Sequence, residues 1–178
     1  MNQEEVLEVI KKIKPKFKHD SEYMFEALGL TKEQTLAVGE YVHGILEQVD
    51  NIPDAVNKIY NEIDNQFAGL LVAWCLGIVD GENRATHQPV LLLVVCISGW
   101  GAVRKATLQF LKERTAIPEN ELEKIFGDVF GEKVMSVSQI MDMLNQLDYN
   151  YDQKLYIAMT MGKEMALMKN VGEMFCPA

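Results

Sequence analysis

The strongest constraint on the fold is an uncharged run of fourteen residues, Val90 to Val103, which holds two glycines on either side of a tryptophan. A run of this kind can be a buried strand, a membrane segment or a helix inside a protein core. Each of these structures needs different surroundings in the rest of the chain. The remaining sequence therefore decides among them.

A buried parallel strand is disfavoured because it would have no partners. The β-branched residues of the run suit such a strand, and "GWGAVR" has the composition of a turn into a helix. A dinucleotide-binding loop, however, needs a third glycine where this chain has Arg104. We find no other short β-branched run that is bounded by turn residues.

A membrane hairpin is disfavoured by length. The two apolar runs, Phe67 to Val79 and Val90 to Val103, have thirteen and fourteen residues. A helix that crosses a bilayer needs about 20. The polar stretch "DGENRATHQP" separates the two runs. The sequence therefore predicts no membrane embedding.

A helix agrees best with the flanking residues. Pro89 suits the first turn of a helix, and no further proline follows before Pro118. Gly99 and Gly101 together cost about 2 kcal/mol relative to alanine, which is tolerable where a neighbouring helix approaches them closely. A helix that is apolar all round at its start belongs in the middle of a bundle. We therefore predict a buried central helix at about residues 89–113, amphipathic only in its second half.

Helical periodicity continues through the rest of the chain. "TKEQ" at residues 31–34 is a capping box, and "NIPD" and "AIPENE" are typical helix starts. Hydrophobic residues make up 48% of the chain, enough to form a core without a disulfide or a metal. The sequence predicts an all-α fold, a compact bundle of about eight helices in a single domain, 1–178.

The pattern also indicates an internal duplication. Shifting the chain by 84 residues places Val38 on Leu122 and "NEID" at 61 on "NQLD" at 145. Two amphipathic regions align by chance at some shift, so a bundle without repeats is the alternative. The duplication predicts two similar four-helix halves, residues 1–84 and 85–168.

The acidic charge balance disfavours nucleic acid as a partner. The formal net charge is −9, and such a surface repels phosphate backbones. One local exception is the segment from Lys11 to Lys18, which holds five lysines. A solvated face is the usual interpretation of such a run, and a docking patch for an acidic partner is the alternative.

Cysteine usage and the N-terminus predict a cytoplasmic location. Cys75, Cys96 and Cys176 have no paired spacing, as is typical of reducing compartments. The first twelve residues lack the apolar stretch of a signal peptide.

One stretch, "DYNYDQ", begins like a calcium loop. Asp148, Asn150 and Asp152 alternate as EF-hand ligands do, but Gln153 stands where the glycine belongs and Met159 where the bidentate glutamate belongs. The alternative is a helix connection in which an Asp or Asn caps the next helix. We predict no metal site and leave open whether these three residues bind a cation.

No catalytic constellation is evident. Glu40 and His43 are one turn apart, as in di-iron bundles, but a second Glu-x-x-His is missing. The other histidines, His19 and His87, lie in no nucleophile motif, and there is no phosphate loop. The sequence therefore predicts neither catalytic residues nor a cofactor, and an enzymatic activity stays open.

The methionines are concentrated at the C-terminal end, where eight of ten lie at or beyond Met135. Flexible thioethers suit adaptable binding grooves and also irregular cores. The leading hypothesis is a non-enzymatic protein-interaction module, an adaptor, regulator or chaperone-like binder. Its Met-rich helices, with the Lys11–Lys18 segment, would contact a protein partner of unknown identity.

The alternative is a helical bundle that binds a small molecule or a metal, and it includes an enzyme. It requires a cavity lined by Trp74, Trp100 or tyrosines, with converging polar groups. A homo-oligomer formed through the Gly99–Gly101 face is compatible with either hypothesis.

Overall fold

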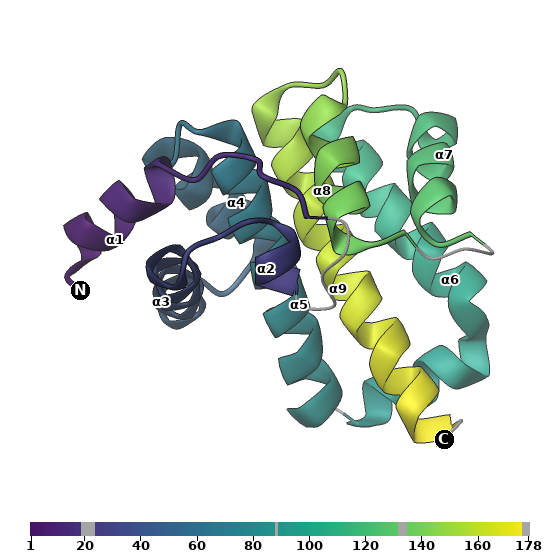
Figure 1. Ribbon diagram of the computed structural model, residues 1–178. Helices are drawn as coiled ribbons and strands as arrows, with labels where there is room; N and C mark the ends of the chain where they lie inside the picture. Colours follow the sequence, from purple (N-terminus) through teal and green to yellow (C-terminus); the bar gives the residue numbers. More distant parts are fainter. Residues whose placement is uncertain (19–23, 88, 132–134, 176–178) are drawn as a thin grey trace.

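Nine helices make up the part of the chain that the computed structural model describes, residues 1–18, 24–87, 89–131 and 135–175 (Figure 1). Side chains are described for residues 1–18, 25–86, 99–131 and 135–170. The helices are α1 (Gln3–Lys11), α2 (Met24–Ala27), α3 (Lys32–Gln48), α4 (Ile52–Glu62), α5 (Gln66–His87), α6 (Pro89–Thr115), α7 (Glu119–Val129), α8 (Val137–Gln146) and α9 (Tyr151–Phe175). No strand occurs in these ranges, so the predicted all-α bundle is confirmed.

The helix starts follow the local sequence signals. Thr31 and Gln34 form the expected capping box of α3, with each side chain accepting from the other residue's backbone N–H. In "NIPD", the Asn51 side chain accepts from the Asp54 N–H and Pro53 occupies the first turn of α4. The α7 start differs, because Pro118 occupies the cap position and makes no side-chain hydrogen bond.

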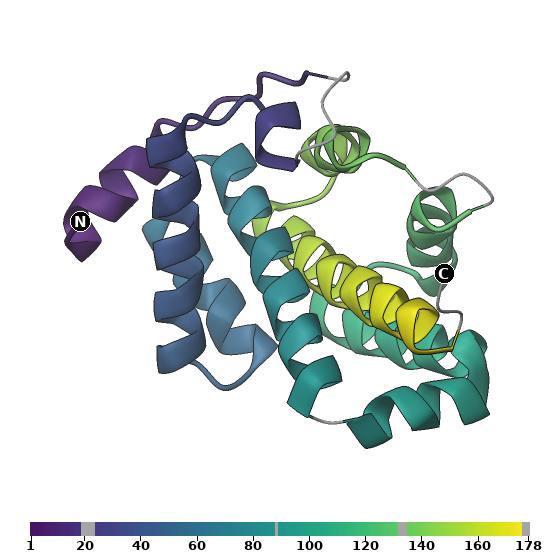
Figure 2. The same cartoon turned by 60° about the horizontal axis from the view of Figure 1, so that its bottom comes forward.

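The centre of the described bundle is a parallel pair of long helices, α5 and α9, which pack on each other more extensively than any other two elements. They lie side by side in both views, with α1, α3 and α4 on one side and α6 and α7 on the other (Figures 1 and 2). Near their starts, the Tyr151 hydroxyl donates to the Ile63 carbonyl at 2.7 Å. Near their ends, the Asn170 amide donates to Glu82 at 3.1 Å, so the two helices run in the same direction.

Glycines allow these two helices to touch through their backbones. A Cβ at Gly77 would collide with the carbonyl oxygen of Met159, and a Cβ at Gly162 would collide with that of Trp74. Any other residue at these positions would push the helices apart. The contact therefore requires glycine on both helices.

This arrangement corrects the role predicted for the other glycine pair. In α6, Gly99 has φ +79° and ψ 161°, which is not helical, so α6 is two helical segments joined by a kink. Added Cβ atoms at Gly99 and Gly101 would meet nothing within 4 Å among the described atoms. The predicted close approach of a neighbouring helix at these glycines is therefore wrong. Gly99 is needed for its backbone conformation, which L-residues rarely adopt.

The position predicted for the central helix also changes. The second half of α6 is amphipathic as predicted, with Leu108 and Leu111 buried and Lys105 and Lys112 exposed. It packs along α9 and α7. The side chains of residues 87–98 lie outside the described set. The most buried segment is Phe67 to Gly77 of α5, so the α5–α9 pair takes the place expected for the 89–113 helix.

The helix register supports the predicted duplication but shifts its period. The starts of α4 and α8, and those of α5 and α9, are each 85 residues apart, from 52 to 137 and from 66 to 151. Gly77 and Gly162 have the same spacing, as do the carbonyls that they approach, those of Trp74 and Met159. The two backbone contacts therefore exchange under one offset of 85, as a pseudo-twofold axis requires. The duplication stays a prediction, with a period of 85 across these helices.

The two apolar runs fall within α5 and α6. None of the described helices combines the length and apolar composition that crossing a membrane requires.

We expect Gly162→Ala to lower the free energy of unfolding by about 2–3 kcal/mol or more, because the added methyl group meets rigid backbone. The matched control is Gly39→Ala on α3, where a Cβ meets nothing within 4 Å. Its higher helix propensity should raise stability by about 0.5–1 kcal/mol. Urea unfolding followed by circular dichroism measures both, and equal effects would contradict the close backbone contact.

Candidate functional site

The residues of the possible calcium loop form a helix start. Asp148, Asn150 and Asp152 are all exposed at the connection between α8 and α9. The Asn150 N–H donates to the Gln153 side chain at 2.8 Å, and the Asn150 carbonyl accepts from the Lys154 N–H at 3.0 Å. No group of three or more His, Cys, Asp or Glu among the described residues is placed to hold a metal ion. This geometry favours the helix-cap interpretation over cation binding.

The other sequence candidates do not come together. Glu40 and His43 are exposed on α3, and His43 Nε2 lies 3.2 Å from the Glu47 carboxylate. Cys75 is buried, and burial raises the pKa of its thiol to about 12, so it stays protonated and unreactive at neutral pH. Four further candidates lie outside the described side chains: His19, His87, Cys96 and Cys176.

The lysine-rich segment is exposed but firmly attached. All five lysines from Lys11 to Lys18 are exposed, whereas Ile13 between them is fully buried. The Asn65 side chain donates to the carbonyls of Lys11 and Ile13 at 3.0 and 2.6 Å. The segment therefore presents its ammonium groups to solvent from an ordered backbone, and partner docking there stays a prediction.

The methionines contribute mainly to the core. Met141, Met159 and Met161 are at most 3% exposed. Four others are half-buried: Met135, Met143, Met165 and Met168. The exposed large hydrophobic side chains of the described chain are scattered over different elements: Met1, Leu36 and Tyr60. The Met-rich helix α9 therefore offers little free apolar surface.

A cavity of about 460 Å³ opens between α4, α5, α6 and α9, and we call it the α6–α9 cavity. Its volume falls within the range of small-molecule sites. Its apolar lining residues are Ile52, Val103, Ala106, Phe110 and Leu167. Its polar lining residues are Arg84, Thr107, Thr160, Lys163 and Glu164. The α6 wall is thus largely apolar, whereas α5 and α9 bring charges.

A buried ion pair connects α6 to α9 behind this wall. Nε and Nη2 of Arg104 each lie 2.7 Å from Oε1 of Glu164, whose side chain is only 3% exposed. The Arg104 guanidinium also lies 5.1 and 5.0 Å from the ring centres of Phe126 and Phe130 on α7. One side chain therefore connects three helices through charge and cation–π contacts.

Glu164 is only partly compensated by this pair. Its second carboxylate oxygen, Oε2, is buried and has no hydrogen-bond partner among the described residues. Burial raises the pKa of Glu164, and the hydrogen bond and charge of Arg104 oppose this shift without cancelling it. The cavity wall therefore contains a carboxyl group with unused hydrogen-bonding capacity.

Two cations share one carboxylate at the junction of this cavity with a second one. Arg84 Nε lies 3.1 Å from Asp80 Oδ2, and Lys163 Nζ lies 3.9 Å from the same oxygen. Arg84, Lys163 and Ile52 also line a neighbouring cavity of about 50 Å³. Burial lowers the pKa of Lys163, the charge of Arg84 lowers it further, and Asp80 opposes both.

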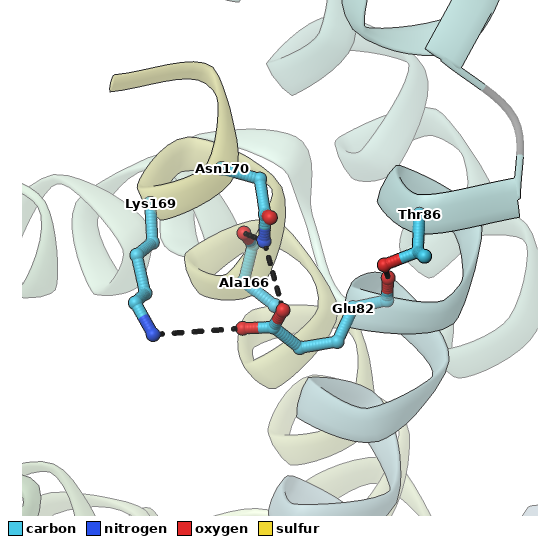
Figure 3. A network of polar contacts seen from close by, with 5 residues as sticks. All are labelled: Glu82, Thr86, Ala166, Lys169 and Asn170. Atoms are coloured by element: carbon cyan, nitrogen blue, oxygen red, sulfur yellow. Dashed lines mark hydrogen bonds and ion pairs between the residues drawn. The ribbon is translucent and has the colours of Figure 1, made fainter. Parts of the chain in front are cut away.

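A polar network at the helix ends holds this region in register (Figure 3). The Asn170 amide donates to Glu82 at 3.1 Å and to the Ala166 carbonyl at 2.8 Å. Lys169 Nζ lies 3.8 Å from the other Glu82 oxygen. These contacts fix the end of α5 against α9 one turn beyond Arg84 and Lys163.

Sequence reasoning missed the charged residues of the α6–α9 cavity. A signal was present, because Lys163 and Glu164 are adjacent charges inside the otherwise apolar stretch "AMTMGKEMALM" of a predicted core helix. Charged residues are almost never fully buried unless they are paired. Arg104, sixty residues away in the sequence, could not be identified as the partner from spacing alone.

Comparisons with protein-family models, with curated proteins and with solved structures each give no match. The geometry of the α6–α9 cavity therefore carries the functional argument.

We expect Arg104→Met to lower the free energy of unfolding by about 3–5 kcal/mol at pH 7, because it leaves Glu164 buried without a counter-charge. Adding Glu164→Gln to this variant should restore much of the loss, since the uncompensated charge is then gone. Denaturant unfolding of both single variants and the double variant measures the coupling. Additive effects would contradict a direct ion pair.

The raised pKa of Glu164 also predicts a pH dependence. A carboxyl whose folded-state pKa exceeds its ordinary value of 4.5 contributes stability that is fully present below 4.5 and is lost as pH rises through the folded pKa. The stability of the wild type relative to Glu164→Gln should therefore increase as pH falls from 7 towards 4.5. Unfolding curves across this range test it, and a difference that is constant or decreases on acidification would contradict the prediction.

Proposed function

We propose that this protein binds a small organic molecule in the α6–α9 cavity. The observation that supports the proposal is the joint presence of an apolar wall, a volume of about 460 Å³ and two lining residues with shifted pKa values, Lys163 and Glu164. Shifted pKa values and converging polar groups in a cavity are typical of binding and active sites.

The two sides of the cavity have complementary roles in this proposal. Val103, Ala106 and Phe110 of α6 bury the apolar part of the molecule, while the charged residues of α5 and α9 orient its polar end. The charged residues are held by their own partners, Lys163 near Asp80 and Glu164 beside Arg104. A ligand therefore meets polar groups that are already in place, which lowers the entropic cost of binding.

Filling the cavity with a side chain tests the proposal. Ala106→Trp places an indole against the cavity wall, whereas Ala102→Trp, one turn earlier on α6, adds the same group at an exposed position outside the lining. The neutral dye N-phenyl-1-naphthylamine, which fluoresces in apolar sites, serves as the probe. Saturable binding to the wild type and to Ala102→Trp, with loss in Ala106→Trp, is the expected result. Equal binding to all three proteins, or no binding to the wild type, would overturn the proposal.

A second candidate function is binding of a protein partner in the cytoplasm. It is favoured by a shallow groove of about 440 Å³ along α8, whose apolar lining consists of Met135, Met143 and Leu147. Asp142 also lines this groove, and the chain carries a net charge of −9. The partner that fits these features is an apolar helical segment with basic flanks.

This second candidate has its own test. Peptides selected on the wild type from a random library should lose binding to Met143→Glu and keep binding to Leu36→Glu, which adds the same charge at an exposed residue of α3. Selected peptides that bind both variants equally would contradict the α8 groove as the interaction surface.

A further inference from the structure

We infer that the ligand of the α6–α9 cavity is an amphiphilic monoanion, with a carboxylate-like head bound by Arg84 and Lys163 and an apolar body against α6. This inference rests on the proposed function and adds the chemical class of the ligand. It follows from where the two cations lie, how their charge is balanced, and what faces them.

Arg84 and Lys163 lie where a ligand in the cavity can reach them. Both line the α6–α9 cavity and the smaller cavity beside it, so they separate the two. Their side chains are 41% and 26% exposed. Their polar ends are therefore accessible without any opening of the core.

The charge at this place is incompletely balanced. A single oxygen, Asp80 Oδ2, is the carboxylate neighbour of both cations, at 3.1 Å from Arg84 Nε and 3.9 Å from Lys163 Nζ. No described contact occupies the Nη atoms of Arg84. Two positive charges against one negative charge leave an excess of one positive charge, in a chain whose net charge is −9. A monoanion restores the balance.

The remaining charged residues do not remove this excess. Glu164 is the only carboxylate that lines the α6–α9 cavity, and Arg104 neutralises it at 2.7 Å. The proximity of Arg84 makes the charged form of Lys163 less favourable, and a bound anion would relieve that repulsion. The planar guanidinium of Arg84 offers two parallel N–H donors, a geometry that suits a carboxylate.

The shape of the cavity limits the rest of the ligand. At roughly 30 Å³ for each non-hydrogen atom, 460 Å³ holds on the order of 15 such atoms. Val103, Ala106 and Phe110 present hydrocarbon to this volume and offer no side-chain hydrogen bond. A medium-length alkyl or aryl carboxylate matches both the volume and the polarity.

Three probes of equal chain length separate head-group recognition from apolar burial: decanoate, decan-1-ol and decylammonium, each kept below its micellar concentration. Displacement of N-phenyl-1-naphthylamine measures their affinities. We expect decanoate to bind at least about tenfold more tightly than decan-1-ol, as one charge-assisted hydrogen bond allows, and decylammonium to bind more weakly than both.

Charge variants identify the residues involved. Arg84→Gln and Lys163→Gln should each weaken decanoate about tenfold and leave decan-1-ol unchanged. Lys169→Gln removes a more exposed lysine from the same helix and should leave decanoate binding unaltered. Arg84→Lys keeps the positive charge and should keep much of the affinity, which shows that a loss in Arg84→Gln is not a folding defect.

The outcomes distinguish this inference from the proposed function. If the three probes bind equally and Ala106→Trp blocks them all, the cavity binds ligands but the anion inference is wrong. If decanoate is preferred but Arg84→Gln and Lys163→Gln do not weaken it, the assigned residues are wrong. If neither the dye nor any probe binds the wild type, both the inference and the proposed function are overturned.

Discussion

The structure depends on the direct backbone contact between α5 and α9. At Gly77 and Gly162 the helices approach until each glycine meets a carbonyl oxygen of the other, and no Cβ fits between them. Such close packing fixes the register of the pair, because a slip by one residue would bring a side chain into the contact. The polar links at both ends, from Tyr151 to Ile63 and from Asn170 to Glu82, are compatible only with that register.

The position of the α6–α9 cavity follows from this register. Gly81 of α5 lies against the backbone of Lys163, so that Arg84, one turn further, and Lys163 come to the same side of the pair. The second half of α6 lies along α9 and is held there by Arg104 on Glu164. The cavity wall is therefore built on three rigid helices, which suits binding of a ligand to residues already in place.

The ionisable residues around the cavity divide into two kinds. Arg104 and Glu164 are buried against aromatic rings and connect helices, so their main role is to hold α6 and α7 on α9. Arg84 and Lys163 are more exposed and share one carboxylate, so they retain hydrogen-bonding capacity for a ligand. Burying a charge is costly unless it is paired, which explains why the deepest carboxylate has the shortest ion pair.

The sequence by itself determined the helical class, many helix boundaries and the buried stripes, because caps and three-to-four-residue periodicity are local properties of the chain. It also indicated the repeat of elements, since Val38 and Leu122 are both buried at equivalent places. Only the tertiary structure decided which helix is central, because an apolar run such as residues 90–103 resembles a core helix wherever it packs. It also decided the candidate site: Arg84, Arg104 and Lys163 are far apart in the chain, and only the α5–α9 contact brings them to one cavity.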